Sequence, residues 1–267
     1  MPGRHTAKRL LRTLKPGRNR SIHPSAKLVI SDEAKLVRGV IVLGSNSSLV
    51  VEAGATIDSD ITIGDNCEVH FSKDSKLVNA SFSVVNGSSV SVGEGAIIDS
   101  PVQPRSSVYV NNGTLRLDQR AHIMSTELMA RFGGRLSIGK YTGIAYGSEI
   151  RCEEQVDIGS YNMISYRVCI YDTNTHSTDW RERRERIEHC FPEGVWEDNK
   201  PATSPVSIGD DVWIGQEVTI TKGAKIGNRC IVGIRTVLGA GIIEDDSVVV
   251  AGKARVISKR ETVDSNV

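Results

Sequence analysis

One histidine, His176, stands where the spacing of the chain predicts a branched aliphatic residue. Ile158, Ile164 and Ile170 follow one another at six-residue steps, and the next step falls on His176. Imidazole changes its charge close to neutral pH, so a histidine can take the proton from a hydroxyl that attacks an activated carbonyl. We therefore expect His176 to act as a general base, with a structural histidine as the alternative. His189, in the same part of the chain, is the rival candidate.

Trp213 is a second side chain that could bind a ligand. It stands between Val212 and Ile214, in an alternation typical of a strand whose apolar neighbours point inward. Its ring is therefore expected to point outward. A large outward aromatic ring needs a partner surface, which is either a ligand or another part of the protein.

The stretch from residue 177 to 204 differs in composition from the chain around it and places arginine beside tryptophan. It includes Trp180, Arg181 and Arg184. Aromatic faces suit sugar rings and guanidinium groups suit carboxylates or phosphates, so these three residues are candidates for binding an acidic glycan. The alternative is a solvated helix whose arginines alternate with glutamates, with Asp179 as its N-cap.

A six-residue repeat between Pro205 and Gly239 describes the elements that must position these side chains. Branched aliphatic residues recur at every sixth position, and a glycine follows five of them. The positions two residues earlier are small or β-branched, which indicates a short strand with two inward side chains and then a turn. Such a unit cannot bury its apolar face alone, so neighbouring units must stack into a solenoid. The aliphatic positions are Ile208, Ile214, Ile220, Ile226, Val232 and Leu238.

The segment from Pro205 to Leu238, PVSIGDDVWIGQEVTITKGAKIGNRCIVGIRTVL, resembles the hexapeptide-repeat acyltransferases. Members of that family include galactoside and maltose O-acetyltransferases and O-acetyltransferases of capsular or lipopolysaccharide glycans. The resemblance implies an all-β fold, a left-handed parallel β-helix solenoid in which three hexapeptides make one triangular coil. Its handedness comes from the resemblance alone, because the general rule for parallel crossovers gives the other hand. The repeat is loose earlier in the chain, where residues 122–131 are expected to form an irregular coil or a short inserted helix.

Composition and repeat strength divide the chain into four segments. Residues 1–21 are a short basic N-terminal segment, and residues 22–137 are an irregular N-terminal β-solenoid. Residues 138–258 are the hexapeptide-repeat acyltransferase β-helix, interrupted by a long loop excursion near residues 177–204. Residues 259–267 are a C-terminal tail.

The resemblance also assigns roles to the candidate residues. In the family the catalytic histidine stands where a coil gives way to an excursion, ahead of an I-G-x-x-V-W-I-G segment, and His176 precedes Ile208–Gly215 in that arrangement. The matching tryptophan lines a cleft between subunits of a homotrimer, which implies that role for Trp213. Where the small-sugar enzymes have an acceptor-binding Asn, this chain reads Ile144-Ala145-Tyr146-Gly147-Ser148, so the resemblance implies a different acceptor. Tyr146 or Ser148 is a candidate for binding it, and the alternative is that both are plain surface residues.

Acetyl-CoA is the acyl donor that the resemblance implies, held in a groove along the last coils. Backbone N–H groups at Gly215-Gln216 would face the reacting carbonyl and stabilise its oxyanion, with an ordinary turn role as the alternative for Gly215. The chain departs from the family here, because Gly252-Lys253-Ala254-Arg255 lacks the usual proline and Gly239-Ala240 replaces a Thr-Lys pair, which leaves the acyl group open. The candidate donor-binding residues, two of them cations for the phosphates, are Gly215, Gly233, Ile234, Gly239, Ala240, Gly252, Lys253 and Arg255.

Charge and composition restrict the partners. The 267 residues carry a net charge of +1, so no nucleic-acid partner is expected. Residues 1–31 hold eight lysines and arginines and no acidic residue, which indicates a solvated arm or a peripheral membrane contact. No apolar run of membrane-spanning length and no secretory signal is present, so we expect a cytoplasmic protein. The five cysteines lack paired spacing, so neither a metal site nor disulfides are expected.

These observations favour an O-acetyltransferase that moves an acetyl group from acetyl-CoA to a sugar hydroxyl, with His176 as the base. The long first half and the charged excursion resemble those of enzymes acting on a cell-surface polysaccharide, such as capsule or lipopolysaccharide, or on its precursor. Three alternatives stay open: an N-acyltransferase on an amino sugar or amino acid, a γ-class carbonic anhydrase, and a non-catalytic β-solenoid scaffold.

Overall fold

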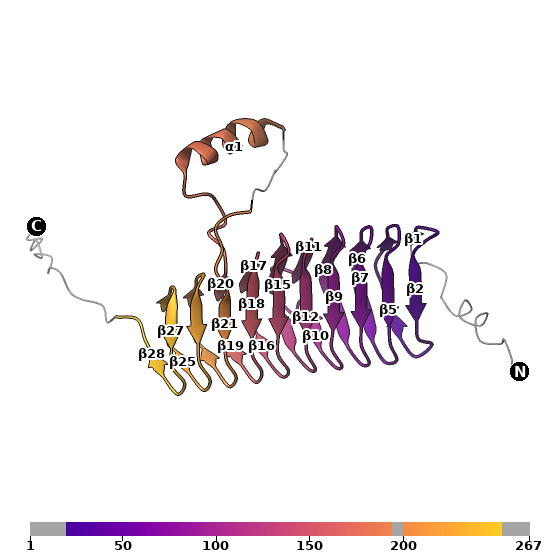
Figure 1. The fold of residues 1–267 in the computed structure, drawn as a ribbon. Helices are drawn as coiled ribbons and strands as arrows, with labels where there is room; N and C mark the ends of the chain where they lie inside the picture. Colours follow the sequence, from indigo (N-terminus) through magenta and orange to yellow (C-terminus); the bar gives the residue numbers. More distant parts are fainter. Residues whose placement is uncertain (1–19, 194–199, 253–267) are drawn as a thin grey trace, which may run out of the picture.

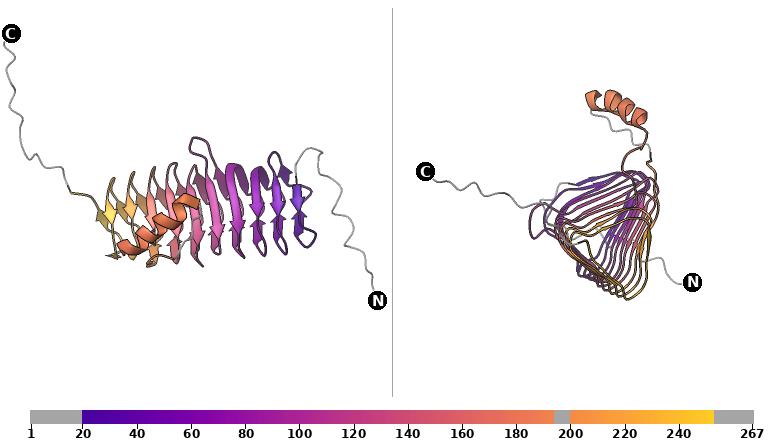
Figure 2. Two further views of the ribbon diagram at one scale, coloured as in Figure 1. Left: turned by 90° about the horizontal axis from the view of Figure 1, so that it is seen from above. Right: turned by 90° about the vertical axis from the view of Figure 1, so that its left-hand side faces the viewer.

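The chain forms short strands that stack in parallel along one axis (Figure 1). Along each strand, inward-pointing aliphatic side chains alternate with outward-pointing side chains. The structure, a computed structural model, describes residues 20–193 and 200–252. Seen from its end, the solenoid is triangular, with three faces (Figure 2). The all-β solenoid predicted from the six-residue repeat is therefore confirmed.

Each face is a ladder of parallel strands from successive coils. The first face contains β3 (Lys35–Leu36), the first part of β6 (Thr56–Ile63) and of β8 (Lys76–Val85), β10 (Ile97–Asp99), β13 (His122–Met124), β16 (Gly143–Ile144), β19 (Met163–Ile164), β22 (Trp213–Ile214), β25 (Ile231–Val232) and β28 (Val248–Val249). The second contains β1 (Arg20–Ile22), β4 (Ile41–Leu43), the second parts of β6 and β8, β11 (Ser107–Asn111), β14 (Glu127–Arg131), β17 (Glu149–Cys152), β20 (Cys169–Tyr171), β23 (Thr219–Ile220) and β26 (Val237–Leu238). The third contains β2 (Lys27–Ile30), β5 (Ser48–Val51), β7 (Glu68–Phe71), β9 (Ser89–Val92), β12 (Thr114–Leu117), β15 (Arg135–Ile138), β18 (Gln155–Ile158), β21 (Val206–Ile208), β24 (Ala224–Ile226) and β27 (Gly241–Ile243).

Coil length explains why the repeat is strict in one part of the chain and loose in another. On the first face, Trp213 pairs with Ile231, 18 residues later, which is three hexapeptides. Ile97 pairs with His122, 25 residues later, so the earlier coils carry extra residues at their corners. Of the two expectations for residues 122–131, the inserted helix was wrong, because this segment forms β13 and β14 within a coil of the solenoid.

The core is a continuous column of aliphatic side chains inside the triangle. Ile208, Ile214 and Ile220 come from the three faces of one coil, and none is more than 3% exposed. Fully burying one such side chain contributes about 1.5–3 kcal/mol. Because each coil buries its apolar side chains against its neighbours, the register between coils is fixed along the whole solenoid.

Corner residues of successive coils also stack on one another. Arg167, Glu217 and Arg235 occupy the same corner of three successive coils, with φ angles of 54°, 58° and 57°. The Glu217 carboxylate accepts hydrogen bonds from Arg235 Nε at 2.6 Å and from Arg167 Nε at 3.1 Å. The hydrogen bonds from these two guanidinium groups lower the pKa of Glu217 to about 2.

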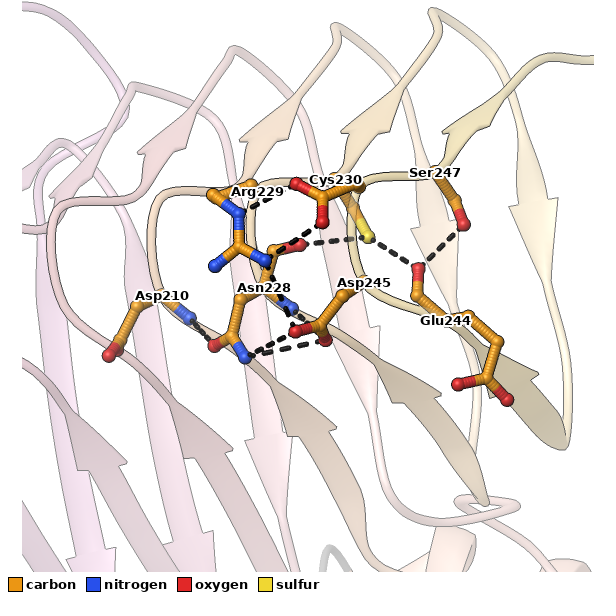
Figure 3. A network of polar contacts seen from close by, with 8 residues as sticks. Asp210, Asn228, Arg229, Cys230, Glu244, Asp245 and Ser247 are labelled. Carbon is orange, nitrogen blue, oxygen red and sulfur yellow. Dashed lines mark hydrogen bonds and ion pairs between the residues drawn. The ribbon is translucent and has the colours of Figure 1, made fainter.

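A second corner is held together by short polar side chains (Figure 3). The backbone N–H of Ser160 donates to Asp210 Oδ1 at 2.6 Å, that of Asp210 to Asn228 Oδ1 at 2.9 Å, and that of Asn228 to Asp245 Oδ1 at 2.9 Å. Each side chain thus satisfies a backbone donor of the preceding coil, where the strand ladder has ended. These hydrogen bonds hold the coil that carries Trp213 in register with the coils before and after it.

Two expected segments fall largely outside the described residues. The basic segment at residues 1–21 enters the described part only at Arg20 and Ser21, which begin β1, and the tail at residues 259–267 lies wholly outside it. Within the described part of the chain, no helix has the length and apolar character needed to cross a bilayer.

Replacing Glu217 by glutamine should make the stability of the fold less sensitive to acid. A carboxylate whose pKa is lowered by folding stabilises the protein fully above its ordinary pKa near 4.5, and that contribution is lost as the pH falls to about 2. We expect the thermal midpoint of the wild type to exceed that of Glu217→Gln near pH 6, and the difference to shrink to zero by about pH 2. Thermal unfolding followed by circular dichroism measures it, and a difference that does not change with pH would contradict the prediction.

Candidate active site

The excursion leaves and rejoins the solenoid on two segments that run side by side. Thr173 and Thr203 form an antiparallel bridge, and the backbone N–H of Asn174 donates to the carbonyl of Ala202 at 3.0 Å. The helix α1 (Trp180–Glu193) therefore stands off the solenoid at the end of a stalk (Figures 1 and 2). The predicted helix is confirmed, and Asp179 caps it by accepting the backbone N–H of Arg181 at 2.8 Å.

A buried aspartate, Asp172, anchors the point of departure. Its carboxylate accepts the backbone N–H groups of Glu153, Glu154 and Gln155 at 2.8, 2.8 and 2.7 Å. Burial raises the pKa of Asp172, while the three backbone donors act in the opposite direction. The carboxylate thus replaces the strand ladder at the corner where the chain turns away.

A second buried carboxylate holds the residue before the candidate base. Glu153 pairs with Arg131 through Oε1 and accepts the hydroxyl of Thr173 through Oε2 at 2.8 Å. The Thr173 hydroxyl in turn accepts the backbone N–H of Thr175 at 3.0 Å. Thr175 adopts a left-handed conformation with φ of 62°, which sets the direction in which His176 leaves the corner. Glu153 and Asp172 were not predicted from the sequence. The one signal of this corner is that the six-residue repeat slips by two residues, from Val156 to Ile158, in the strand that follows it.

His176 itself is exposed at the base of the stalk. Its Nδ1 atom lies 3.5 Å from Nη1 of Arg186, which belongs to α1. Arg183, on the same helix, donates from Nη1 to the carbonyl of Ser177 at 2.8 Å. The helix is therefore folded back onto the segment that carries the candidate base.

The three candidate glycan-binding residues of the excursion lie together on α1. The guanidinium carbons of Arg181 and Arg184 lie 5.0 and 4.9 Å from the centroid of the Trp180 ring. Trp180 remains exposed, so the cluster presents an aromatic face and two cations to the outside.

The two candidates of the preceding coil have different surroundings. Tyr146 is exposed and stacks on Tyr166, with ring centroids 4.3 Å apart. Ser148 corrects the expectation, because it is only 3% exposed and its hydroxyl is used inside the wall. That hydroxyl donates to the carbonyl of Ser165 at 3.2 Å and accepts the backbone N–H of Val168 at 3.1 Å. It therefore cannot contact an acceptor.

Trp213 points outward from β22, as predicted, and is 53% exposed. It belongs to the first face, whereas His176 leaves the corner between the second and third faces, opposite to it. The structure of one chain therefore does not bring Trp213 and His176 together.

Most donor-binding candidates lie at the C-terminal end of the solenoid. Ile234, Gly239, Ala240 and Gly252 are exposed there. Two further candidates, Gly215 and Gly233, directly follow the strands β22 and β25. The last two, Lys253 and Arg255, lie outside the described residues. The Gly215 backbone N–H donates to the carbonyl of Val232 at 2.7 Å, so this N–H is used within the ladder and does not point at a ligand. The expected oxyanion donor at Gln216 stays a prediction.

Known proteins share the repeat that builds these coils. The family model described as bacterial transferase hexapeptide (six repeats) matches residues 205–240. Residues 205–240 therefore carry the transferase hexapeptide repeat. The matched residues form the coils that carry Trp213, Gly215, Gly233 and Gly239.

Two curated relatives match the chain over part of their length. The probable acetyltransferase Rv3034c of Mycobacterium tuberculosis is 41% identical over 58 residues, 22% of this chain and 19% of the relative. The putative lipopolysaccharide biosynthesis O-acetyl transferase WbbJ of Escherichia coli is 32% identical over 112 residues, 40% of this chain and 51% of the relative. The matches thus span about half or less of these two proteins.

One solved structure aligns with part of the chain. The hexapeptide-repeat acetyltransferase VCA0836 of Vibrio cholerae, in complex with acetyl-CoA, is 22% identical and aligns with a TM-score of 0.35. The alignment covers 64% of this chain and 71% of that protein.

Replacing Asp172 by alanine should destabilise the whole solenoid. Three backbone N–H groups, one buried and two part-buried, would lose their acceptor, and leaving a buried donor unsatisfied costs about 1–3 kcal/mol. We expect a loss of that size in the free energy of unfolding, measured by guanidinium denaturation.

Asp179→Ala is the matched control, because it removes a cap from α1 alone and should leave the main unfolding transition in place. Equal losses in the two variants would contradict the anchoring role of Asp172.

Proposed function

We propose that the protein is an O-acetyltransferase that moves an acetyl group from acetyl-CoA to a sugar hydroxyl of a cell-surface polysaccharide, such as capsule or lipopolysaccharide, or of its precursor. One observation carries the proposal: an exposed histidine, His176, stands on an anchored corner where an excursion leaves a solenoid whose residues 205–240 match the transferase hexapeptide repeat. The names of the two relatives support the acetyl group, and one of them names lipopolysaccharide biosynthesis.

The proposed reaction is a direct transfer with His176 as the general base. The imidazole takes the proton of the acceptor hydroxyl while the hydroxyl oxygen attacks the thioester carbonyl. The carbon–sulfur bond then breaks, and the imidazolium returns the proton to the leaving thiolate. No covalent intermediate is required, because the base acts on the acceptor itself.

The described end of the solenoid suits the arm of the donor. Ile234 and Val237 are exposed apolar side chains on the last coils, next to the small residues Gly239 and Ala240. An apolar strip with small residues beside it fits an extended thioester arm, and Lys253 and Arg255 are the proposed partners of its phosphates. A coenzyme A donor also favours a cytoplasmic reaction, with the basic N-terminal segment as the proposed membrane contact.

We also propose a homotrimer, because the site is incomplete in one chain. Four outward side chains of the first face lie in one register and are apolar: Met163, Trp213, Ile231 and Val248. Met163 and Val248 are 71% and 67% exposed. An exposed apolar ladder of this kind is typical of a protein interface, and closed cyclic symmetry would bring the Trp213 of one chain to the excursion of another.

His176→Ala should lower acceptor-dependent release of the thiol from acetyl-CoA by about a hundredfold or more, because the hydroxyl would lose its base. The release is measured with acidic and neutral glycans and with amino sugars as acceptors, and donor binding by calorimetry should stay unchanged. Loss of activity in His189→Ala with activity retained in His176→Ala would overturn the assignment. Turnover with amino sugars alone would point to an N-acyltransferase.

Met163→Glu should dissociate the trimer, because it places a charge in the apolar ladder of the first face. Light scattering after size exclusion should give the mass of three chains for the wild type and of one chain for the variant. Lys225→Glu, an exposed change on the third face, is the control that should stay trimeric. A wild type with the mass of one chain would refute the trimer.

A further inference from the structure

The corner between the third and the first face carries two exposed tyrosines on neighbouring coils. Tyr141 lies between β15 and β16, and Tyr161 takes the equivalent place between β18 and β19. Both residues are left-handed, with φ angles of 56° and 59°. Their rings stack with centroids 5.3 Å apart and an angle of 4° between the planes. The rings are 42% and 48% exposed, so the stack stands on the surface.

Two exposed cations lie over these rings. The guanidinium carbon of Arg120 is 5.7 Å from the centroid of Tyr141, and Lys140 Nζ is 5.4 Å from that of Tyr161. Among the described residues, neither cation has a carboxylate within ion-pairing distance. We call Arg120, Lys140, Tyr141 and Tyr161 the tyrosine corner.

Elsewhere on the solenoid, corner cations are compensated by carboxylates. Farther along the same corner, Arg229 Nε donates to Asp246 Oδ1 at 2.6 Å. On another corner, Glu217 lies between Arg167 and Arg235. In the tyrosine corner the cations contact rings instead, which contributes about 0.5–1 kcal/mol at an exposed site. A ring accepts no N–H bond in the plane of the guanidinium group, so the donors of both cations stay available to an anion.

The groups that remain free in this corner indicate the class of ligand. Arg120 lies on the coil before Tyr141 and Tyr161 on the coil after it, so both faces of the Tyr141 ring are covered. A nucleobase binds by stacking on a free ring face, which this arrangement does not offer. The two tyrosine hydroxyls have no hydrogen-bond partner among the described residues, and each can donate and accept. Hydroxyl partners beside carboxylate partners suit an acidic polysaccharide.

The dimensions of the solenoid suit a polymer as well. Equivalent positions on successive coils recur about every 4.8 Å, so an extended sugar chain meets a new coil at nearly every residue. The third face separates the tyrosine corner from the corner of His176. Residues 154–160 cross this face, which corresponds to about 20 Å at about 3.3 Å per residue. A chain several sugars long therefore reaches from one corner to the other.

We propose that the tyrosine corner is a binding site for an acidic polysaccharide chain, separate from the candidate active site. Carboxylates of the chain bind Arg120 and Lys140, and its hydroxyls bind those of Tyr141 and Tyr161. The site holds the polymer against the solenoid while another sugar of the same chain lies at the excursion. The binding itself involves neither acetyl-CoA nor His176, so it does not depend on the proposed reaction.

Calorimetric titration of the full chain with a galacturonate oligosaccharide, without acetyl-CoA, tests the site. Arg120→Gln and Lys140→Gln should each weaken binding about tenfold, because each removes a charge-assisted hydrogen bond. Tyr161→Phe keeps the stacked ring but loses the hydroxyl, and should weaken binding about threefold. Lys140→Arg keeps the cation and should retain the wild-type affinity. The methyl ester of the oligosaccharide, which has lost its charge, should bind about a hundredfold more weakly than the free acid.

Arg229→Gln is the matched control, because it removes a cation of the same corner whose charge Asp246 already offsets. It should leave the affinity unchanged, and so should His176→Ala. Equal affinities for the oligosaccharide and its methyl ester, or equal losses in Arg229→Gln and Lys140→Gln, would overturn the proposal.

Three further results would also overturn it. A loss in His176→Ala as large as that in Lys140→Gln would move the binding to the excursion. Tighter binding of single-stranded oligothymidylate than of the oligosaccharide would indicate a nucleic-acid surface. Absence of binding at millimolar oligosaccharide would leave the tyrosine corner with a structural role alone, whatever the activity at His176.

Discussion

Each coil of this protein buries its aliphatic side chains only against the coils before and after it, and this constraint fixes the register of everything on the outside. Strands of neighbouring coils lie about 4.8 Å apart, so outward residues at equivalent positions meet in columns. Tyr141 and Tyr161 stack with ring centroids 5.3 Å apart, in a column like that of Arg167, Glu217 and Arg235. A residue on one coil must therefore be compatible with its equivalents on the next, in charge as well as in shape.

The excursion breaks the register between β20 and β21, and the structure shows how the break is stabilised. A chain that leaves the stack leaves backbone donors without their ladder partners at a buried or part-buried corner, which is costly unless another acceptor is present. Asp172 supplies acceptors for three such donors, and Glu153 holds Thr173 and, through it, Thr175. The same buried carboxylates that permit the excursion thus position the residue next to His176.

The sequence predicted those features that depend on the repeat alone. The strict hexapeptides after Pro205 gave the inward isoleucines and the outward ring of Trp213, because a period of six in a three-sided coil leaves no other arrangement. Coils longer than 18 residues hide that period, so β13 and β14 were not foreseen. Ser148 and the Gly215 N–H were misjudged for another reason: their partners are on the neighbouring coil, about 17 to 20 residues away in the sequence, where local pattern carries no information.

The same constraint explains why the proposed donor and acceptor sites lie on different parts of the chain. On the solenoid, each outward side chain is constrained by the equivalent residues of the neighbouring coils. The coils therefore suit an extended and regular ligand, such as a thioester arm. The excursion has no such columns, so side chains of its helix, such as Trp180 and Arg184, are not constrained by equivalent residues on neighbouring coils. In the proposed function, the acceptor is therefore selected by the excursion and the donor is bound by the coils. Because the excursion also carries His176, the proposed acceptor-binding residues and the proposed base lie on the same segment, outside the regular columns of the coils.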